Sequence, residues 1–251
     1  MFIYNILMSK FKFAAFITCL IMTYAIHTHA GTTKGTPTSQ QSRNLYGSLG
    51  LNTTPSARHD PAGFITATIS TSDPYVHGSI SAQLSDNFNI TLRQSAEVSN
   101  ITDDPDRFYP GIDLRLKLLN EDTYAPAMTL GLNSAFGHKR FASEYLVASK
   151  RYKDLDFSAG IAWGRLGSAA HISNPLSILG SHFDKRRDLS SENPNTIENW
   201  FTGEDIGFFG GVEYFLPAFK DIDGFSLKAD WGADRYIIEQ QNIDGFDAPD
   251  P

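Results

Sequence analysis

The chain has 251 residues, enough for one ordinary domain or part of a larger protein, and its formal net charge is −7. That acidic balance excludes a surface built to follow nucleic-acid phosphates. The single cysteine, Cys19, excludes a disulfide framework and a cysteine-based zinc site. Aromatic residues make up 12% of the chain, with 20 glycines and regularly spaced Phe-, Tyr-, Ser- and Asn-rich segments, which favours an all-β protein.

Residues 1–30 are expected to be a signal peptide. Lys10 and Lys12 precede the apolar run 13-FAAFITCLIMTYAI-26, and Ala30 ends an acceptable cleavage site. The run is shorter than the ~20 apolar residues of a membrane-spanning helix. Lipid attachment at Cys19 is not favoured, because the residues before it make a poor lipobox and most of the apolar run follows it.

Residues 31–63 are expected to be polar and irregular. The stretch 45-LYGSLGLNTTPSARHDPAGF-64 is rich in Gly and Pro and has no sustained period. From residue 64 a period of two residues begins, which is typical of strands. It predicts strands at 64–70, 76–84, 88–95, 112–119, 127–133, 143–152, 155–165, 206–216 and 225–232.

The hairpin 143-SEYLVASKRYKDLDFSAGIAWGRLG-167 shows this period most clearly. Around a turn at Lys153-Asp154, its second strand places Leu155, Phe157, Ala159, Ile161 and Trp163 on one face and small or polar residues on the other. Such a strand fits either a soluble sheet with an apolar core or an outer-membrane barrel with lipid outside and a polar lumen inside. The expected signal peptide and the lengths of the connections along the chain favour the barrel.

Short and long connections are expected to alternate from the second strand onward, the longest being residues 166–205. An outer-membrane barrel shows this sorting, with short turns on one side and long loops on the other. The predicted fold is therefore an antiparallel up-and-down meander that forms all or part of a transmembrane β-barrel over residues 64–241, with residues 242–251 as a tail. Nine strands is an odd number, and 235-RYIIEQQ-241 is a poor candidate for a tenth, so an incomplete barrel is expected.

Charged residues within the strands are expected to line the lumen, because a charge facing lipid is costly. These lumen candidates are Asp113, Arg115, Lys117, Glu144, Lys150, Glu213, Lys228 and Asp230. In the long loop, Lys185, Arg186 and Arg187 are weaker candidates for binding glycan or lipopolysaccharide, since a solvated loop charge is the commoner explanation.

The remaining motifs do not predict catalysis. The acidic run 103-DDPD-106 lacks the Gly and Glu of an EF-hand, and the seven His have no metal-ligand spacing. The run 207-GFFGG-211 indicates close packing or a bend. We expect no catalytic residues, no metal and no cofactor.

Several stretches resemble the YjbH-like family of exopolysaccharide and capsule biosynthesis proteins. They are 49-LGLNTTPSAR-58, 114-LRLKLLNEDTYAPAMTLGL-132, the hairpin at 143–167, 208-FFGGVEYFLP-217 and 227-LKADWGADRY-236. The resemblance implies a non-catalytic outer-membrane β-barrel protein that takes part in polysaccharide export or assembly. It also implies outer-membrane lipid, polysaccharide and other export proteins as partners, and a chain that is only the N-terminal part of a longer protein.

Two alternatives stay open. The chain could be a soluble periplasmic β-domain that binds glycan or a partner protein, or a truncated remnant without function. The environment of Phe157, Ile161, Trp163, Leu114 and Leu116 separates the first alternative from the barrel. Exposure of these side chains to the surroundings favours the barrel, and burial against a second layer favours the soluble domain.

Overall fold

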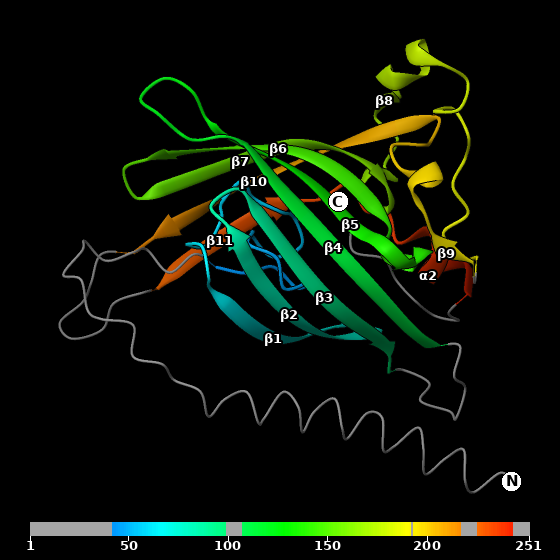
Figure 1. Ribbon diagram of the computed structural model, residues 1–251, viewed down its shortest axis with the longest axis horizontal. Coiled ribbons are helices and arrows are strands. Elements are labelled where there is room, and N and C mark those ends of the chain that lie inside the picture. Colours follow the sequence, from blue (N-terminus) through cyan, green and yellow to red (C-terminus); the bar gives the residue numbers. More distant parts are fainter. Residues whose placement is uncertain (1–41, 99–106, 192, 217–224, 243–251) are drawn as a thin grey trace, which may run out of the picture.

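The computed structural model describes residues 42–98, 107–191, 193–216 and 225–242 (Figure 1). The expected signal peptide, the acidic run at 103–106 and most of the expected tail lie outside these residues. Within them, no helix is long and apolar enough to cross a membrane.

The regular secondary structure of the described chain is mainly antiparallel sheet, as the period of two residues predicts. The long strands are β1 (Ile65–Ser72), β2 (Tyr75–Ser85), β3 (Phe88–Glu97), β4 (Phe108–Leu119), β5 (Ala127–His138), β6 (Ser143–Tyr152), β7 (Leu155–Gly164), β10 (Asp205–Phe215) and β11 (Ser226–Trp231). Each pairs with the next along the chain, so the sheet is an up-and-down meander. β1 and β11 end this order, and no pairing between them closes the described sheet.

The long connection between β7 and β10 is more ordered than expected. It contains two short strands: β8 (Ile172–Ser173), which pairs with β10, and β9 (Pro194–Asn195), which pairs with β5. It also holds the 3-10 turns η4 (Arg165–Gly167), η5 (Pro175–Leu179) and η6 (Ile197–Asn199); a further such turn, η3 (Lys139–Phe141), connects β5 to β6.

The end of the described chain and the connections between strands test two expectations about the chain's organisation. Residues 235–241, the poor candidate for a tenth strand, add no strand; instead the short helix α2 (Ile237–Asn242) follows β11, because this stretch lacks a period of two residues. The alternation of connections is also weaker than expected. β5 extends to His138, which shortens its connection to 139–142, whereas the connection after β4 spans 120–126.

The sheet is strongly curved, and residues 42–63 lie on its concave face (Figure 1). Burial alternates along the strands accordingly: in β2 every residue from Tyr75 to Gln83 with odd number is buried, and the even-numbered ones are half-buried. In β1 the apolar Ile65 and Ile69 point to the convex face and are exposed. The sheet therefore buries its polar side and exposes its apolar side.

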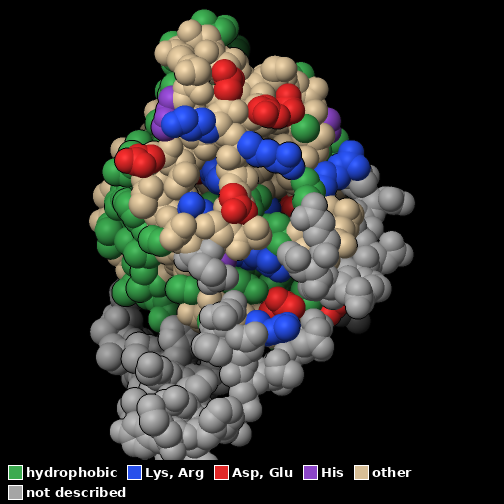
Figure 2. Space-filling model, turned by 90° about the vertical axis from the view of Figure 1, so that its right-hand side faces the viewer, with side chains coloured by type: hydrophobic (Ala, Val, Ile, Leu, Met, Phe, Trp, Pro, Cys, Tyr) green, Lys and Arg blue, Asp and Glu red, His purple; other side chains and the backbone are tan. Residues whose placement is uncertain are grey.

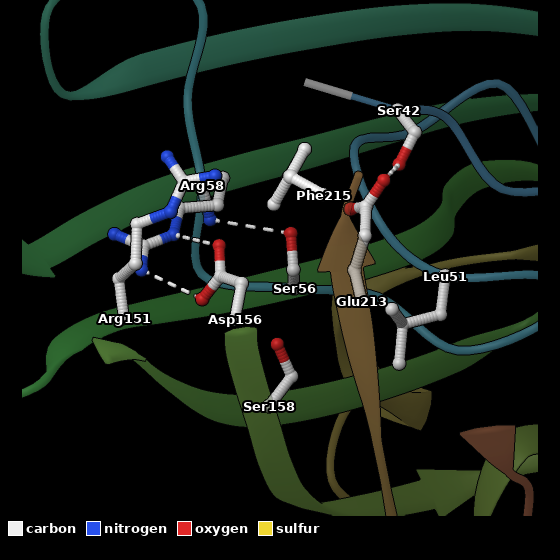
Figure 3. A pocket seen from close by; sticks show the side chains of 9 residues that line it. All are labelled: Ser42, Leu51, Ser56, Arg58, Arg151, Asp156, Ser158, Glu213 and Phe215. Carbon is white, nitrogen blue, oxygen red and sulfur yellow. Dashed lines mark hydrogen bonds and ion pairs between the residues drawn. The ribbon is translucent and has the colours of Figure 1, made fainter. Parts of the chain in front are cut away.

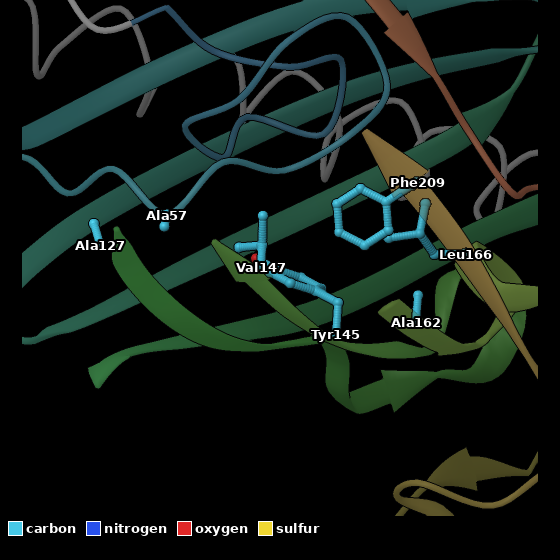
Figure 4. Close-up of a cluster of buried hydrophobic side chains, with 7 residues drawn as sticks. All are labelled: Ala57, Ala127, Tyr145, Val147, Ala162, Leu166 and Phe209. Carbon is cyan, nitrogen blue, oxygen red and sulfur yellow. The ribbon is translucent and has the colours of Figure 1, made fainter. Parts of the chain in front are cut away.

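A small apolar cluster lies between the concave face and residues 42–63 (Figure 4). It consists of Ala57, Ala127, Tyr145, Val147, Ala162, Leu166 and Phe209. Ala57 comes from residues 42–63, and the others come mainly from β5, β6, β7 and β10. This cluster fixes the middle of the segment against the sheet.

Candidate functional site: the concave face and its covering segment

Residues 42–63, here called the covering segment, connect both edges of the sheet. On the β1 side, the Ser70 hydroxyl donates to the Leu45 carbonyl. On the β11 side, the Asp230 carboxylate accepts hydrogen bonds from Asn52, Thr53 and Thr54. The segment thus lies across the concave face where a hollow interior is expected.

Local turns shape the covering segment. Gly47 has a φ of 85°, a left-handed conformation that glycine adopts without strain. The Asn44 side chain accepts hydrogen bonds from the backbone N–H groups of Tyr46 and Ser48. The Gly- and Asn-rich sequence therefore produces a compact irregular fold instead of a strand.

Two cations of the sheet bind backbone carbonyls of the covering segment. Lys228 Nζ donates to the carbonyl oxygens of Arg43, Gly50 and Leu51 at 3.1–3.2 Å. Arg115 donates to the carbonyls of Ser56 and Arg58 at 2.5 and 2.9 Å. Both contacts satisfy buried backbone acceptors that have no partner in a strand ladder.

Anionic side chains of the sheet hold the same segment through its own cation. Arg58 forms a bidentate pair with Asp156 of β7 at 2.7 and 2.8 Å. Its third nitrogen reaches Glu121, in the connection between β4 and β5, at 2.6 Å. Planar bidentate pairs of this kind fix orientation as well as charge.

His59 of the covering segment is buried between the segment and the strands. Its Nδ1 accepts from the Gln83 amide at 3.1 Å, which leaves Nε2 to donate to the Thr129 hydroxyl at 3.1 Å. Burial, together with the nearby charges of Arg115 and Lys117, lowers the pKa of His59 to about 3. The imidazole is therefore neutral at physiological pH.

A cavity of about 70 Å³ remains between the covering segment and the strands (Figure 3). Its lining is Ser42, Leu51, Ser56, Arg58, Arg151, Asp156, Ser158, Glu213 and Phe215. Glu213 already accepts from Ser42 and Ser226, and Arg151 lies 4.1 Å from the centroid of the Phe215 ring. The cavity has room for several water molecules.

Nearer the long connection, Arg93 and Asp113 form a second bidentate pair, at 3.0 Å for both contacts, and each side chain is 1% exposed. Asp113 also accepts from the backbone N–H of Ser134 at 2.6 Å. Because its charge is neutralised within the sheet, Asp113 is a structural partner of Arg93.

A further cluster lies at this end and was not expected from the sequence. Arg165 binds Glu239 of α2 at 2.9 Å and Asp234 at 2.7 Å. Tyr75 accepts from Arg140 at 2.6–2.8 Å and donates to Glu239. Apart from Tyr75 at the start of β2, these residues lie in the turns η3 and η4, in the chain after β11 and in α2, where no periodic signal marks them.

Six of the eight expected lumen candidates belong to the concave face. Asp113, Arg115, Lys117, Glu213, Lys228 and Asp230 are cross-strand neighbours of residues that point to this face. Glu144 and Lys150 lie on the convex face, opposite Trp163 and Phe157 respectively, so the shared register expected for all eight is wrong. In β6 it is Tyr145 and Val147 that point inward.

The two convex charges are compensated locally. Glu144 is 0% exposed and forms a bidentate pair with Arg187 at 2.6 and 2.9 Å. Lys150 donates to the carbonyl oxygens of Asp122 and Ala125. Arg187 is therefore not presented to a glycan, in contrast to the expectation; Lys185 and Arg186 are exposed.

The environments of the five discriminating side chains differ. Phe157 and Leu116 are 47% and 43% exposed, and Leu114 and Ile161 are half-buried. Trp163 is 5% exposed because the long connection covers it: its Nε1 donates to Asn174 at 2.9 Å and its ring contacts Phe201. Most of this apolar face thus has no second protein layer over it in the described part of the chain.

Among the described residues, no group of three or more His, Cys, Asp or Glu side chains could hold a metal ion. The acidic side chains of the concave face are engaged by arginines or by the covering segment; Glu97, for example, pairs with Arg107 at 2.9 Å and accepts from the Tyr109 hydroxyl. This arrangement positions and neutralises charge.

These features define an all-β protein whose curved antiparallel sheet encloses its own N-terminal segment through ion pairs and hydrogen bonds. The chain belongs to the YjbH family of exopolysaccharide biosynthesis proteins: residues 42–249 match the family model described as exopolysaccharide biosynthesis protein YbjH. A curated relative, the uncharacterized lipoprotein YjbH of Escherichia coli (strain K12), is 32% identical over 185 residues. The match covers 70% of this chain and 26% of that protein, so the chain spans about a quarter of the relative's length. No solved structure matches the chain.

Proposed function

We propose that the chain forms part of the wall of an outer-membrane β-barrel that takes part in exopolysaccharide export or assembly without catalysing a reaction. The observation that carries the proposal is the inverted burial of the sheet, with charged groups enclosed and apolar groups outside. In water, an apolar face of this extent would be a liability. Against hydrocarbon, the same face is stabilising.

The middle of the convex face is aliphatic. Ile69 and Leu92 are 64% and 52% exposed, and Leu114, Leu130 and Leu146 continue the band across the sheet. The strands from β2 to β7, and β10, have 10 to 12 residues, the length that a tilted strand needs to cross a bilayer.

Exposed aromatic side chains gather toward the two ends of the strands. At the end with the β2–β3 and β6–β7 turns, here called the turn end, are Phe64, Tyr124, Tyr152, Tyr214 and Phe225. Toward the opposite end, here called the loop end, are Phe108, Phe136, Phe208 and Trp231. Aromatic girdles on either side of an apolar band are typical of outer-membrane barrels.

The charges on the convex face also agree with a lipid environment. Among the described strand residues with this orientation, only Glu144 and Lys150 are charged, and each lies near the end of its strand. The first is neutralised by Arg187 and the second reaches the carbonyls of a turn. A Lys at the midplane would instead cost about 2–4 kcal/mol.

The covering segment limits how such a wall could act on a polymer. Because the segment occupies the concave face, we infer that a polysaccharide is accommodated there only after the segment moves, or is guided along the outer rim. The family's role in exopolysaccharide biosynthesis supports polysaccharide, outer-membrane lipid and other export proteins as the proposed partners.

The test is fractionation of the full protein in its natural cells, with a carbonate wash and with protease added to whole cells. We expect carbonate-resistant outer-membrane signal and cleavage within residues 166–204. In parallel, deletion of the gene is expected to reduce surface polysaccharide. Release by carbonate would favour the soluble periplasmic domain, and unchanged polysaccharide in a strain that expresses the protein would contradict the role in export.

A further inference from the structure

The long connection between β7 and β10 carries an apolar tip. In η5, Ile178 and Leu179 are 89% and 73% exposed, and the nearby Ile172 is 45% exposed. The whole stretch 166-LGSAAHISNPLSILGSH-182 contains no Asp, Glu, Lys or Arg. An uncharged stretch that exposes its largest aliphatic side chains is unusual for a loop surrounded by water.

This exposure is fixed by the fold. The Asn174 side chain is 1% exposed and donates to the carbonyls of Phe183, Phe201 and Gly203 at 2.9–3.1 Å. Its oxygen accepts from Trp163 Nε1 and from the Leu176 N–H. A buried amide with five hydrogen bonds holds the start of η5 against β7, so the tip is presented as a rigid projection.

The tip continues the apolar surface of the convex face. β8 pairs with β10 immediately before η5, and the His171 ring lies 5.2 Å from Trp231 and 5.7 Å from Phe208 between ring centroids. Figure 1 shows the chain next to β8 projecting beyond β10 at the loop end. In Figure 2, which keeps the vertical axis, the uppermost part of the molecule carries hydrophobic side chains.

The charges next to the tip do not form a binding surface for an anionic partner. Lys185 and Arg186 follow it and are exposed, but they stand between Asp184 and Asp188, which offset them. Arg187 is held by Glu144. A docking surface for an anionic partner would need an excess of basic side chains, which this tip lacks.

From these observations we propose that the tip formed by Ile172 and η5 is a lipid-binding foot. Ile178 and Leu179 insert at the boundary between headgroups and acyl chains at the loop end, as interfacial apolar segments do to a depth of about 5–10 Å. The occupant is the lipid of the same membrane that contacts the convex face. The inference rests on the proposed barrel wall and adds a contact outside the strands.

The experiment places an environment-sensitive fluorophore on single cysteines in the full chain, with Cys19→Ser as background. The labelled variants are Ile178→Cys in the tip, Asn193→Cys at an exposed position of the same connection, and Leu92→Cys on the convex band. Each protein is reconstituted in phosphatidylcholine bilayers that contain nitroxide lipids with the quencher at a shallow or a deep position.

We expect the label at 178 to shift its emission to the blue and to be quenched more strongly by shallow than by deep nitroxide, while the label at 193 stays unquenched. Replacing part of the phosphatidylcholine by phosphatidylglycerol is expected to leave this pattern unchanged, because the local charges cancel. The double variant Ile178→Asp/Leu179→Asp cannot carry the label at 178, so it is labelled at Ile172→Cys. Its label is expected to be quenched less by the shallow nitroxide than the same label in a protein with Ile178 and Leu179 intact.

The label at 92 separates the foot from the wall. Deep quenching at 92 without quenching at 178 would overturn the foot and leave the wall intact. Quenching at 178 alone would support the foot and contradict the wall, and no quenching at either position would overturn both. Energy transfer between labels at 178 on different copies, without quenching by lipid, would overturn the foot in favour of a second copy as the occupant.

Discussion

At the scale of single residues, Asp230 is the main anchor of the covering segment on the β11 side. Its Oδ2 accepts from the backbone N–H groups of Thr53 and Thr54 at 2.8 and 3.0 Å, and from both threonine hydroxyls at 3.0–3.1 Å. Its Oδ1 accepts from the Asn52 amide. Several donors converge on one carboxylate, so its removal affects all of them together.

We expect Asp230→Ala to weaken the docking of the covering segment by roughly 1.5–3 kcal/mol, the net value of hydrogen bonds to a charged group. Trypsin cleavage after Arg43 and Arg58 reports the change, because both bonds lie in the segment. The matched control is Asp205→Ala, at an exposed position at the start of β10. Equal cleavage of the two variants would contradict the anchoring role.

His59 gives the segment a dependence on pH. The pKa of a free His is about 6.5, whereas burial and the nearby Arg115 and Lys117 lower that of His59 to about 3. Protonation therefore favours the undocked state: docking is strongest above pH ~6.5 and weakens as the pH falls toward 3. Hydrogen exchange of residues 52–59, corrected for its intrinsic rate, should lose protection over this range. In His59→Gln the loss should be smaller; an identical profile would exclude His59 as its cause.

Some of this residue-scale arrangement could be read from the sequence. The period of two residues correctly grouped Asp113, Arg115 and Lys117 on one face. The partners of Arg115 and Lys228 could not be read, because the covering segment has no period and both cations contact its backbone carbonyls. The cost of a charge in lipid predicts an inward Glu144, but Arg187, 43 residues away along the chain, neutralises this carboxylate on the convex face.

At the scale of elements, glycines of one strand receive aromatic rings of the next. Gly131 of β5 is the cross-strand neighbour of Tyr145 in β6, and Gly160 of β7 is that of Phe209 in β10. A Cβ atom at Gly131 would lie 2.0 Å from the Tyr145 ring, and one at Gly160 would lie 2.5 Å from the Phe209 ring. These pairs let large rings lie flat beneath the covering segment.

We expect Gly131→Ala to displace the Tyr145 ring and to lower the free energy of unfolding by about 1–3 kcal/mol, the usual cost of overpacking. Heat-dependent migration of the folded protein in gels, or urea titration, measures the loss. Gly232→Ala is the control, since the nearest atom to its added Cβ is 3.5 Å away. The packing argument fails if the two variants unfold alike.

The strands themselves were the most predictable elements. Alternation located all nine strands of the meander, and the turn at Lys153-Asp154 was placed correctly. The ends were less predictable: β4 begins at Phe108, before the expected 112, and β5 continues to His138, past the expected 133. Gly111, Pro110 and Gly137 interrupt the alternation there, so pairing between the two strands, rather than local pattern, sets these bounds.

At the scale of the whole molecule, the structure places its enclosed polar network and its exposed apolar band on opposite faces of one sheet. The sequence pattern predicts two distinct faces but not which of them is enclosed. That choice follows from the covering segment, which brings Arg58 to Asp156 and backbone carbonyls to Lys228 and Arg115, and so satisfies these charges of the concave face. The apolar side chains of the convex face therefore contact the medium that surrounds the protein, which is either lipid or water.

A charge placed on the convex band identifies that medium. Leu92 lies near the middle of β3 and is 52% exposed, so a lysine side chain at this position extends away from the sheet and does not disturb the core. If the band faces hydrocarbon, Leu92→Lys costs about 2–4 kcal/mol and the yield of carbonate-resistant, folded protein falls sharply. If it faces water, an exposed substitution changes stability by no more than about 0.5 kcal/mol. Tyr124→Lys, in the turn between β4 and β5 and 95% exposed, introduces the same charge outside the band and should be tolerated in both cases. A yield that falls for Leu92→Lys but not for Tyr124→Lys would locate the hydrocarbon layer on the sheet, and equal yields would assign the sheet to an aqueous compartment.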